Sequence, residues 1–239
     1  MTTHPMLQDS VVMVITLLLA LGWLRMMDAL AAHHGLEQKL SRKIIHIGTG
    51  PLFVLCWPFF SPQPSARYFA ALVPLAITLQ FIGIGMGWIQ DPEAVQAMTR
   101  NGDPQEILKG PLFYGLVFVA CTLGFWRTSP VGILALMMMC GGDGLADIVG
   151  RRLGVHKLPF SPEKSWAGSA AMFAGSFLFA LSFLSLFNRL NYFQPPLAGP
   201  ASIVAAIALI VTLVEALPFR DIDNLTLTGV AVALGLWWF

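Results

Sequence analysis

Charged residues and glycines are concentrated between Cys140 and Ser169, in the stretch CGGDGLADIVGRRLGVHKLPFSPEKSWAGS, whereas the rest of the chain is mostly apolar. Asp143 and Asp147 are four residues apart, so a continuous helix would place both carboxylates on one face, about 6 Å apart between Cβ atoms. Two carboxylates at that distance repel each other unless a cation lies between them. Mg²⁺ suits such a pair, because it takes oxygen ligands and commonly bridges one or two carboxylates to substrate phosphates.

Basic residues follow the aspartates closely. Arg151, Arg152, Lys157 and Lys164 supply the positive charge that an anionic polyphosphate needs. The alternative, for these residues alone, is a cytoplasmic loop that obeys the positive-inside rule. The aspartates favour a functional site, because an acidic pair at the end of an apolar segment is costly to insert into a membrane and is rarely kept for packing. Glycines such as Gly144 let the backbone approach a ligand closely.

The composition is that of an integral membrane protein. Of the 239 residues, 56% are hydrophobic and 11% are charged, whereas soluble domains carry about 25% charged residues. The formal net charge of +1, with no basic stripe outside the loops, excludes a nucleic-acid partner. The three cysteines lie in or beside apolar runs without metal-ligand spacing, which predicts small buried side chains and no disulfide framework.

Apolar runs predict an all-α fold, a polytopic bundle of about seven to eight transmembrane helices that forms one membrane domain over residues 1–239. The runs cover residues 11–32, 44–60, 66–89, 110–128, 130–149, 166–187, 200–217 and 224–239. A helix needs about 20 residues to cross a bilayer, so the last run is short for a full crossing. The first run lacks a basic segment ahead of it, which favours an uncleaved spanning helix over a signal peptide. The polar segment at residues 90–110 predicts a short amphipathic helix or a lid.

Lysines and arginines are distributed unevenly among the loops. The loops after the first, third, fifth and seventh runs hold Lys39, Arg42, Lys43, Arg100, Lys109, Arg151, Arg152, Lys157, Lys164 and Arg220, and the opposite loops hold Arg67, Arg127 and Arg189. The positive-inside rule makes the first set cytoplasmic and places the N-terminus outside. The first run begins so near the N-terminus that we expect a multi-pass protein of a prokaryotic inner or photosynthetic membrane, or else a processed form of another protein.

Most of the unusual polar residues fall on the predicted cytoplasmic side. They are Arg42, Lys43, His46, Lys109, Asp143, Asp147, Glu215, Asp221, Asp223 and Asn224. Clustering at one face predicts a single site there. Two alternatives remain open at this point: His46 could be a hydrogen-bonded structural residue, and Glu215 could form a salt bridge with a basic residue of the same site.

Familiar catalytic motifs are absent from the sequence. It contains no G-x-x-x-x-G-K-[ST] phosphate loop, no G-x-S-x-G turn and no H-E-x-x-H zinc motif. Phosphoryl transfer remains attractive, because it requires mainly positioning and charge neutralisation.

Four segments, taken in order, resemble the polyprenol kinase family and in particular its phytol kinase branch. They are Arg42-Lys43-Ile44-Ile45-His46, Lys109-Gly110-Pro111 before Tyr114, GDGLADIVGRRLG with KLPFSPEKSWAGS after it, and Glu215 with Asp223-Asn224. That family uses CTP, is related to the dolichol kinases, and belongs with the CTP:phosphatidate cytidylyltransferases in one membrane superfamily. The cytidylyltransferase signature itself is missing. Trp166 stands where the family often has a glutamate, so we assign it no role.

The resemblance implies a CTP-dependent kinase that phosphorylates a membrane isoprenoid alcohol, phytol, with Mg²⁺ at the cytoplasmic face, for tocopherol biosynthesis. Metal ligands would be Asp143, Asp147 and Asp223. Nucleotide-binding residues would be Arg151, Lys157, Lys164, Ser165, Gly144 and Asn224. Catalytic candidates are Asp143, Lys43, His46, Lys109 and Glu215.

Other functions remain as alternatives. The acceptor could be geranylgeraniol, farnesol, dolichol or diacylglycerol, or the enzyme could be a CTP-using cytidylyltransferase. A transporter should carry polar residues at the bilayer midplane and on both sides, whereas the outside half of this chain is almost bare. A homo-oligomer is left open.

Overall fold

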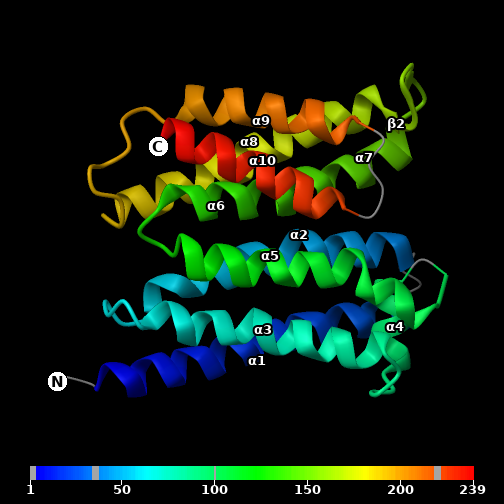
Figure 1. Cartoon of the computed structure of the whole chain (residues 1–239). Coiled ribbons are helices and arrows are strands. Elements are labelled where there is room, and N and C mark those ends of the chain that lie inside the picture. Colours follow the sequence, from blue (N-terminus) through cyan, green and yellow to red (C-terminus); the bar gives the residue numbers. More distant parts are fainter. Residues whose placement is uncertain (1–3, 34–37, 100, 218–221) are drawn as a thin grey trace. The chain divides into compact units, whose positions relative to one another are not determined.

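The computed structural model describes residues 4–33, 38–99, 101–217 and 222–239, and these residues are mostly helical (Figure 1). The all-α prediction is confirmed. Arg100, Arg220 and Asp221, which entered the predictions above, lie outside the described residues, as does the side chain of Lys39. The chain divides into two compact units, residues 1–123 and 124–239. The expected single membrane domain stays a prediction.

Five helical stretches in the described part of the chain are long and apolar enough to cross a membrane, which confirms an integral membrane protein. They are Pro5–Met27, Ala66–Gly85, Pro104–Gly124, Pro130–Leu153 and Trp166–Arg189. The other three predicted runs are also helical, in α2 (Gln38–Cys56), α9 (Ala201–Glu215) and α10 (Asp223–Trp238). With 16 residues, α10 is only about 24 Å long, which is less than the hydrocarbon thickness of about 30 Å.

The first unit is a bundle of long helices. Its elements are α1 (Pro5–His33), α2, η1 (Trp57–Phe59), α3 (Ala66–Gly85), α4 (Pro92–Met98), η2 (Pro104–Leu108) and α5 (Gly110–Gly124). Close packing joins α1 to α2, because a Cβ atom on Gly48 would lie 2.8 Å from Cε2 of Trp23. The buried Asp9 carboxylate accepts hydrogen bonds from the backbone N and the hydroxyl of Ser61, at 2.7 and 2.8 Å. These bonds tie the start of α1 to the segment after α2.

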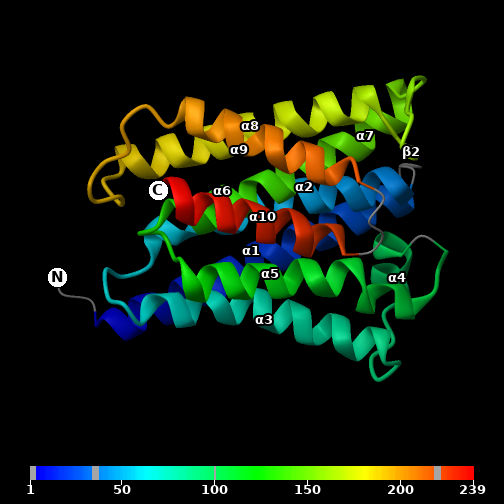
Figure 2. The same ribbon diagram turned by 45° about the horizontal axis from the view of Figure 1, so that its top comes forward.

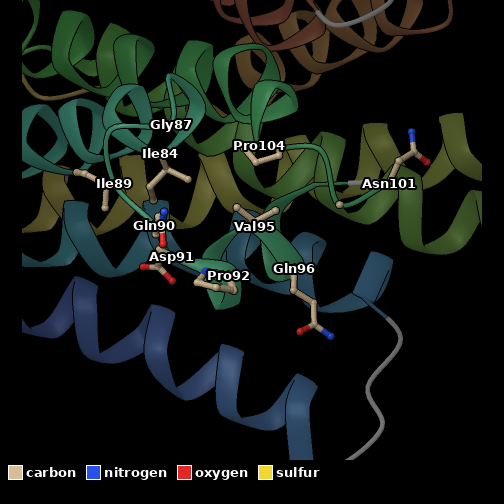
Figure 3. Close-up of a pocket in the computed structure, with 11 residues that line it drawn as sticks. Ile84, Gly87, Ile89, Gln90, Asp91, Pro92, Val95, Gln96, Asn101 and Pro104 are labelled. Atoms are coloured by element: carbon tan, nitrogen blue, oxygen red, sulfur yellow. The ribbon is translucent and has the colours of Figure 1, made fainter.

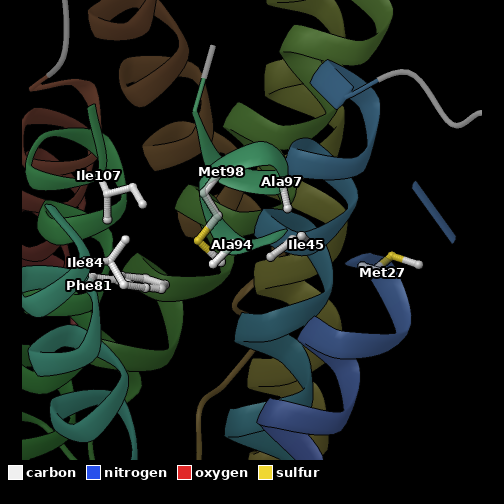
Figure 4. Close-up of a cluster of buried hydrophobic side chains, with 8 residues drawn as sticks. All are labelled: Met27, Ile45, Phe81, Ile84, Ala94, Ala97, Met98 and Ile107. Atoms are coloured by element: carbon white, nitrogen blue, oxygen red, sulfur yellow. The ribbon is translucent and has the colours of Figure 1, made fainter. Parts of the chain in front are cut away.

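The polar segment between α3 and α5 folds back onto this bundle. Figure 4 shows the buried cluster to which α4 contributes: Met27, Ile45, Phe81, Ile84, Ala94, Ala97, Met98 and Ile107. Asp91 caps α4 by accepting a hydrogen bond from the backbone N of Ala94 at 3.0 Å, and Arg25 of α1 pairs with Asp91 and Glu93. The expected short amphipathic helix is therefore confirmed, and its apolar face is part of the core.

The second unit begins with one helix that changes its winding. It consists of α6 (Pro130–Met137), the π-helix η3 (Met138–Asp143) and α7 (Gly144–Leu153), and it extends four residues beyond the predicted end at 149. An antiparallel hairpin of β1 (Lys157–Leu158) and β2 (Ser161–Ser165) leads into α8 (Trp166–Arg189), followed by α9 and α10. The π-helix and the hairpin were not predicted.

Glycines on both partners allow close contact between this first helix and α8. A Cβ atom on Gly142 would lie 2.8 Å from Sδ of Met172, and one on Gly175 would lie 2.9 Å from the carbonyl carbon of Gly141. Small residues permit such approach between membrane helices. Asp143, the last residue of the π-helix, is thereby held against α8, and we call these glycine contacts the η3–α8 seam.

We expect Gly175→Ala to lower the thermal stability of the protein, because its methyl group would overlap the backbone of Gly141 and overpacking costs about 1–3 kcal/mol. Gly229→Ala in α10 is the matched control, since nothing lies within 4 Å of the position its Cβ would take. Alanine should there be neutral or stabilising by up to about 1 kcal/mol. Thermal unfolding in detergent measures both variants, and equal midpoints would contradict the seam.

Candidate functional site

Several of the predicted site residues gather at the end of the second unit that carries the hairpin (Figure 1; Figure 2). There, Lys164 on β2 forms an ion pair with Glu215 at the C-terminal end of α9. The Glu215 side chain is 5% exposed and the Lys164 side chain is 26% exposed. A nearly buried carboxylate requires such a partner, so the salt-bridge alternative for Glu215 is confirmed.

The electrostatic surroundings of Lys164 are acidic. Burial on its own would lower the pKa of Lys164, but the Glu215 carboxylate outweighs burial and the pKa is raised above its usual value of 10.5. Asp143 and Asp223 raise the pKa further. Because the folded-state pKa is the higher one, the ion pair stabilises the fold at neutral pH, and this contribution is lost only as the pH rises through the raised pKa. Lys164 thus contacts Glu215, a residue far away in sequence, and lies within electrostatic range of Asp143 and Asp223.

The π-helix sets the position of Asp143. This residue is 6% exposed, and both it and Gly144 have helical dihedrals, so the helix continues without a break into α7. The condition for Asp143 and Asp147 to share a face is therefore met. Segments of π-helix occur frequently at functional sites. The signal that could have suggested this one is the Gly141-Gly142 pair inside an otherwise apolar run.

The Asp147 carboxylate forms an ion pair with a residue of its own helix. Nε of Arg151 donates to both carboxylate oxygens of Asp147, at 2.9 Å each. The cation beside Asp147 in this structure is therefore the Arg151 guanidinium. The predicted metal ligand and the predicted phosphate ligand form one i,i+4 pair, while the neighbouring Arg152 is exposed.

Ser165 has a structural role. Its hydroxyl oxygen accepts a hydrogen bond from the backbone N of Gly168 at 3.1 Å and so caps α8. Lys157 is exposed and pairs with Ser165 across the hairpin. Gly144 is buried inside the continuous helix, and Asn224 is buried in the first turn of α10. Nucleotide contacts of these four residues stay predictions.

The carboxylate oxygens of the site are the type of ligand that Mg²⁺ prefers, although the described residues do not form a complete coordination sphere. Among the residues that the structure describes, no group of three or more His, Cys, Asp or Glu side chains is arranged to hold a metal ion. Asp143, Asp147 and Asp223 therefore do not form a three-carboxylate site by themselves. Mg²⁺ in phosphoryl-transfer sites usually takes one or two carboxylates together with waters and substrate phosphates. The carboxylates of Asp143 and Asp223, which both act on Lys164, are ligands of that class.

The first unit brings two other sequence segments together. The Tyr114 hydroxyl on α5 donates to the backbone oxygen of His46 on α2 at 2.8 Å, and the two rings lie 4.5 Å apart. Lys43, one turn before His46, is 9% exposed. Lys109 is exposed and directly precedes α5, where its carbonyl accepts from the backbone N of Phe113. The contact that Tyr114 makes with His46 was not predicted, and the roles of Lys43, His46 and Lys109 stay predictions.

A pocket of about 790 Å³ opens beside α4 in the first unit (Figure 3). Its lining combines amide side chains such as Gln90, Gln96 and Asn101 with apolar ones such as Ile84 and Val95. None of the predicted site residues lines this pocket, so it gives no support to the predicted nucleotide site.

Comparison with known proteins gives the family, although no family model and no solved structure matches the chain. The chain is 42% identical over 217 residues to a probable phytol kinase 1, chloroplastic, of Glycine max, which covers 90% of this chain and 72% of that protein. A probable phytol kinase, chloroplastic, of Triticum aestivum is 44% identical over 209 residues, 87% of this chain and 70% of its own length. Phytol kinase 1, chloroplastic, of Arabidopsis thaliana is 43% identical over 194 residues, 81% and 64% of the two chains.

The chain belongs to the phytol kinase family. This confirms the resemblance drawn from the sequence segments, and it makes the protein a kinase that phosphorylates an alcohol. The three relatives are plant proteins named chloroplastic, so the expectation of a prokaryotic membrane gains no support from them.

We expect Lys164→Met to destabilise the fold by about 2–3 kcal/mol, because removing one partner leaves the Glu215 carboxylate buried without its ammonium. The double variant Lys164→Met/Glu215→Leu should recover much of this loss, since replacing both charges together is close to neutral. Arg152→Met, at an exposed position, is the control and should change stability by no more than about 0.5 kcal/mol. Unfolding in detergent measures the series, and a double variant no more stable than Lys164→Met would contradict the ion pair.

Proposed function

We propose that this protein transfers the γ-phosphoryl group of CTP to the hydroxyl group of phytol, giving phytyl phosphate and CDP, with Mg²⁺ and at the cytoplasmic face of its membrane. The observation that carries this proposal is the ion pair that Lys164 of β2 forms with Glu215 at the end of α9, within electrostatic range of Asp143 and Asp223. Phytol as the acceptor is supported by the names of the relatives. Membership of a kinase family argues against the transporter alternative.

Phosphoryl transfer requires positioned charge more than covalent participation of the protein. The phytol hydroxyl oxygen bonds to the γ-phosphorus while the bond from that phosphorus to the oxygen bridging it to CDP breaks, and the hydroxyl proton is released. Negative charge on the phosphate oxygens needs neutralisation throughout. Lys164 and Arg151 supply cationic side chains for it. Bound Mg²⁺ would add further positive charge, with Asp143 and Asp223 as its carboxylate ligands.

Two acidic residues act in this proposal through their basic partners. Glu215 positions the ammonium of Lys164, and Asp147 positions the guanidinium of Arg151. Ser165 caps α8, whose first backbone N–H groups form the type of helix terminus that binds phosphate. Gly144 and Asn224 complete the nucleotide site.

The remaining candidates lie in the first unit. We assign Lys43, His46 and Lys109 to charge neutralisation or proton transfer, in keeping with the family's sequence segments. The apolar helices provide a surface for the phytyl chain, while its hydroxyl stays at the level of the lipid headgroups.

The reaction is tested with purified protein in detergent, Mg²⁺, and CTP or ATP labelled in the γ-phosphate. The acceptor panel comprises phytol, geranylgeraniol, farnesol, dolichol and diacylglycerol. We expect label in phytyl phosphate, with CTP as the better donor. Label that appears only with ATP would overturn the donor, and preferential labelling of another alcohol would overturn the acceptor. Release of pyrophosphate with a cytidylylated lipid would establish the cytidylyltransferase alternative.

Metal binding is tested by comparing two aspartate variants. Asp143→Asn should reduce turnover by on the order of 100-fold or more, as does the loss of one electrostatic group at a transition state, and should raise the Mg²⁺ concentration needed for half-maximal activity. Asp147→Asn should instead raise the KM for CTP with little change in Mg²⁺ dependence, if it acts only by orienting Arg151. Arg152→Gln is the control. Unchanged Mg²⁺ dependence in Asp143→Asn would exclude that residue as a ligand.

The orientation is tested with exposed positions replaced by cysteine. Labelling by an impermeant thiol reagent should reach Gln105→Cys and Arg152→Cys from the cytoplasmic side, and Gln63→Cys and Gln194→Cys from the opposite side. Gly154 is avoided, because a Cβ atom there would lie 2.8 Å from Cβ of Ser165. Labelling of 152 and 194 from the same side would contradict the predicted topology.

A further inference from the structure

The hairpin that carries Lys164 and the residues on either side of it expose large apolar side chains. Leu153 is 67% exposed, Val155 84%, Phe160 58% and Trp166 61%. Leu153 ends one candidate membrane span, and Trp166 begins the next. The hairpin is therefore joined at both ends to helices that lie in the bilayer.

Strand pairing arranges these apolar side chains along the hairpin. The backbone N of Trp166 donates to the carbonyl of His156 at 3.1 Å, which places Val155 close to Trp166 at the base of the hairpin. Phe160 lies in the turn between the two strands. Apolar surface is thus present from the base to the tip.

Basic side chains accompany this apolar surface. Arg152 and Lys157 are exposed, and Glu163 is the one acidic residue between 154 and 165. Apolar side chains next to cations are typical of segments that lie in a bilayer interface, where the apolar groups enter the acyl boundary and the cations meet anionic headgroups. Tryptophan is enriched at the same depth. In water, by contrast, the four large apolar side chains would remain hydrated at a cost.

We propose that the hairpin lies in the headgroup layer of the bilayer that holds the protein and binds anionic lipids there. Val155, Phe160 and Trp166 enter the acyl boundary, and Arg152 and Lys157 bind lipid phosphate groups. Lys164, on the same hairpin, is thereby held at headgroup depth. That depth suits the hydroxyl of a lipid alcohol, a consequence that rests on the proposed function, whereas the seating of the hairpin does not.

The test measures how deep individual side chains lie in the bilayer, and it does not depend on catalysis. The full chain is placed in lipid nanodiscs with a nitroxide on a cysteine introduced at Val155 or Phe160. The signal of the parent chain after the same labelling, which comes from its native cysteines, is subtracted. Collisions with oxygen, which concentrates in the bilayer, are compared with collisions with a water-soluble nickel chelate. Leu178, 57% exposed within the span of α8, is the lipid reference, and Gln63, which is exposed and lies outside the candidate spans, is the water reference.

We expect the oxygen-to-nickel collision ratio at 155 and 160 to exceed the ratio at 63 several-fold and to remain below that at 178. Ratios equal to that at 63 would overturn the proposal. Spin–spin broadening at 160 would also overturn it, because that result would show a second copy of the chain covering the surface.

The role of anionic lipid is tested by adding phosphatidylglycerol to phosphatidylcholine discs. The ratio at 160 should rise with phosphatidylglycerol in the parent chain, and it should not rise in the Arg152→Gln/Lys157→Gln variant. An equal rise in both would overturn the assignment of these two residues to lipid phosphates. If the parent chain shows the expected depth at 160 but does not phosphorylate phytol, the result counts against the proposed reaction and leaves the position of the hairpin in the bilayer established.

Discussion

A carboxylate buried at the end of an apolar helix constrains the whole second unit. Glu215 ends α9 with a side chain that is 5% exposed, and its charge is tolerable there because the Lys164 ammonium lies beside it. Lys164 reaches that position because the chain turns back after α7 in a hairpin. The ion pair therefore fixes the path of the chain between two membrane helices, and it also sets the charge of the site where Asp143 and Asp223 act.

Close backbone packing between the π-helix η3 and α8 supports the position of Asp143. Gly141, Gly142 and Gly175 let the π-helix and α8 approach at distances that any larger side chain would prevent. A π-turn adds a residue to the helical repeat, and so changes the direction in which the following residues face. Asp143 is the last residue of the π-helix, and Asp147 follows one turn later in α7. The glycines of the η3–α8 seam thus help to determine where these two carboxylates lie.

The sequence was sufficient for the elements whose pattern is local. Eight apolar runs corresponded to eight helical segments, because the burial of about 20 consecutive apolar residues in a bilayer leaves few other structures. The expected carboxylate pair on one face also follows from local geometry. By contrast, the pairing of Lys164 with Glu215 and of Tyr114 with His46 joins segments far apart in the sequence, so it depends on the tertiary fold. Composition and spacing did not distinguish among the possible partners of these residues. The hairpin was missed because its strands are short and carry no apolar alternation.

Lys164 and Ser165 are consecutive residues of β2, and the pairing of β2 with β1 is irregular at this point, because Lys157 lies opposite Ser165 whereas Leu158 lies opposite Ser161. Lys164 presents its ammonium to Glu215, and the next residue buries the hydroxyl that caps α8. A shift of the strand pairing at this irregularity would move both residues, removing the charge from Glu215 and the cap from the helix together. Electrostatics of the site and the start of a membrane helix are in this way governed by one variable, the strand register.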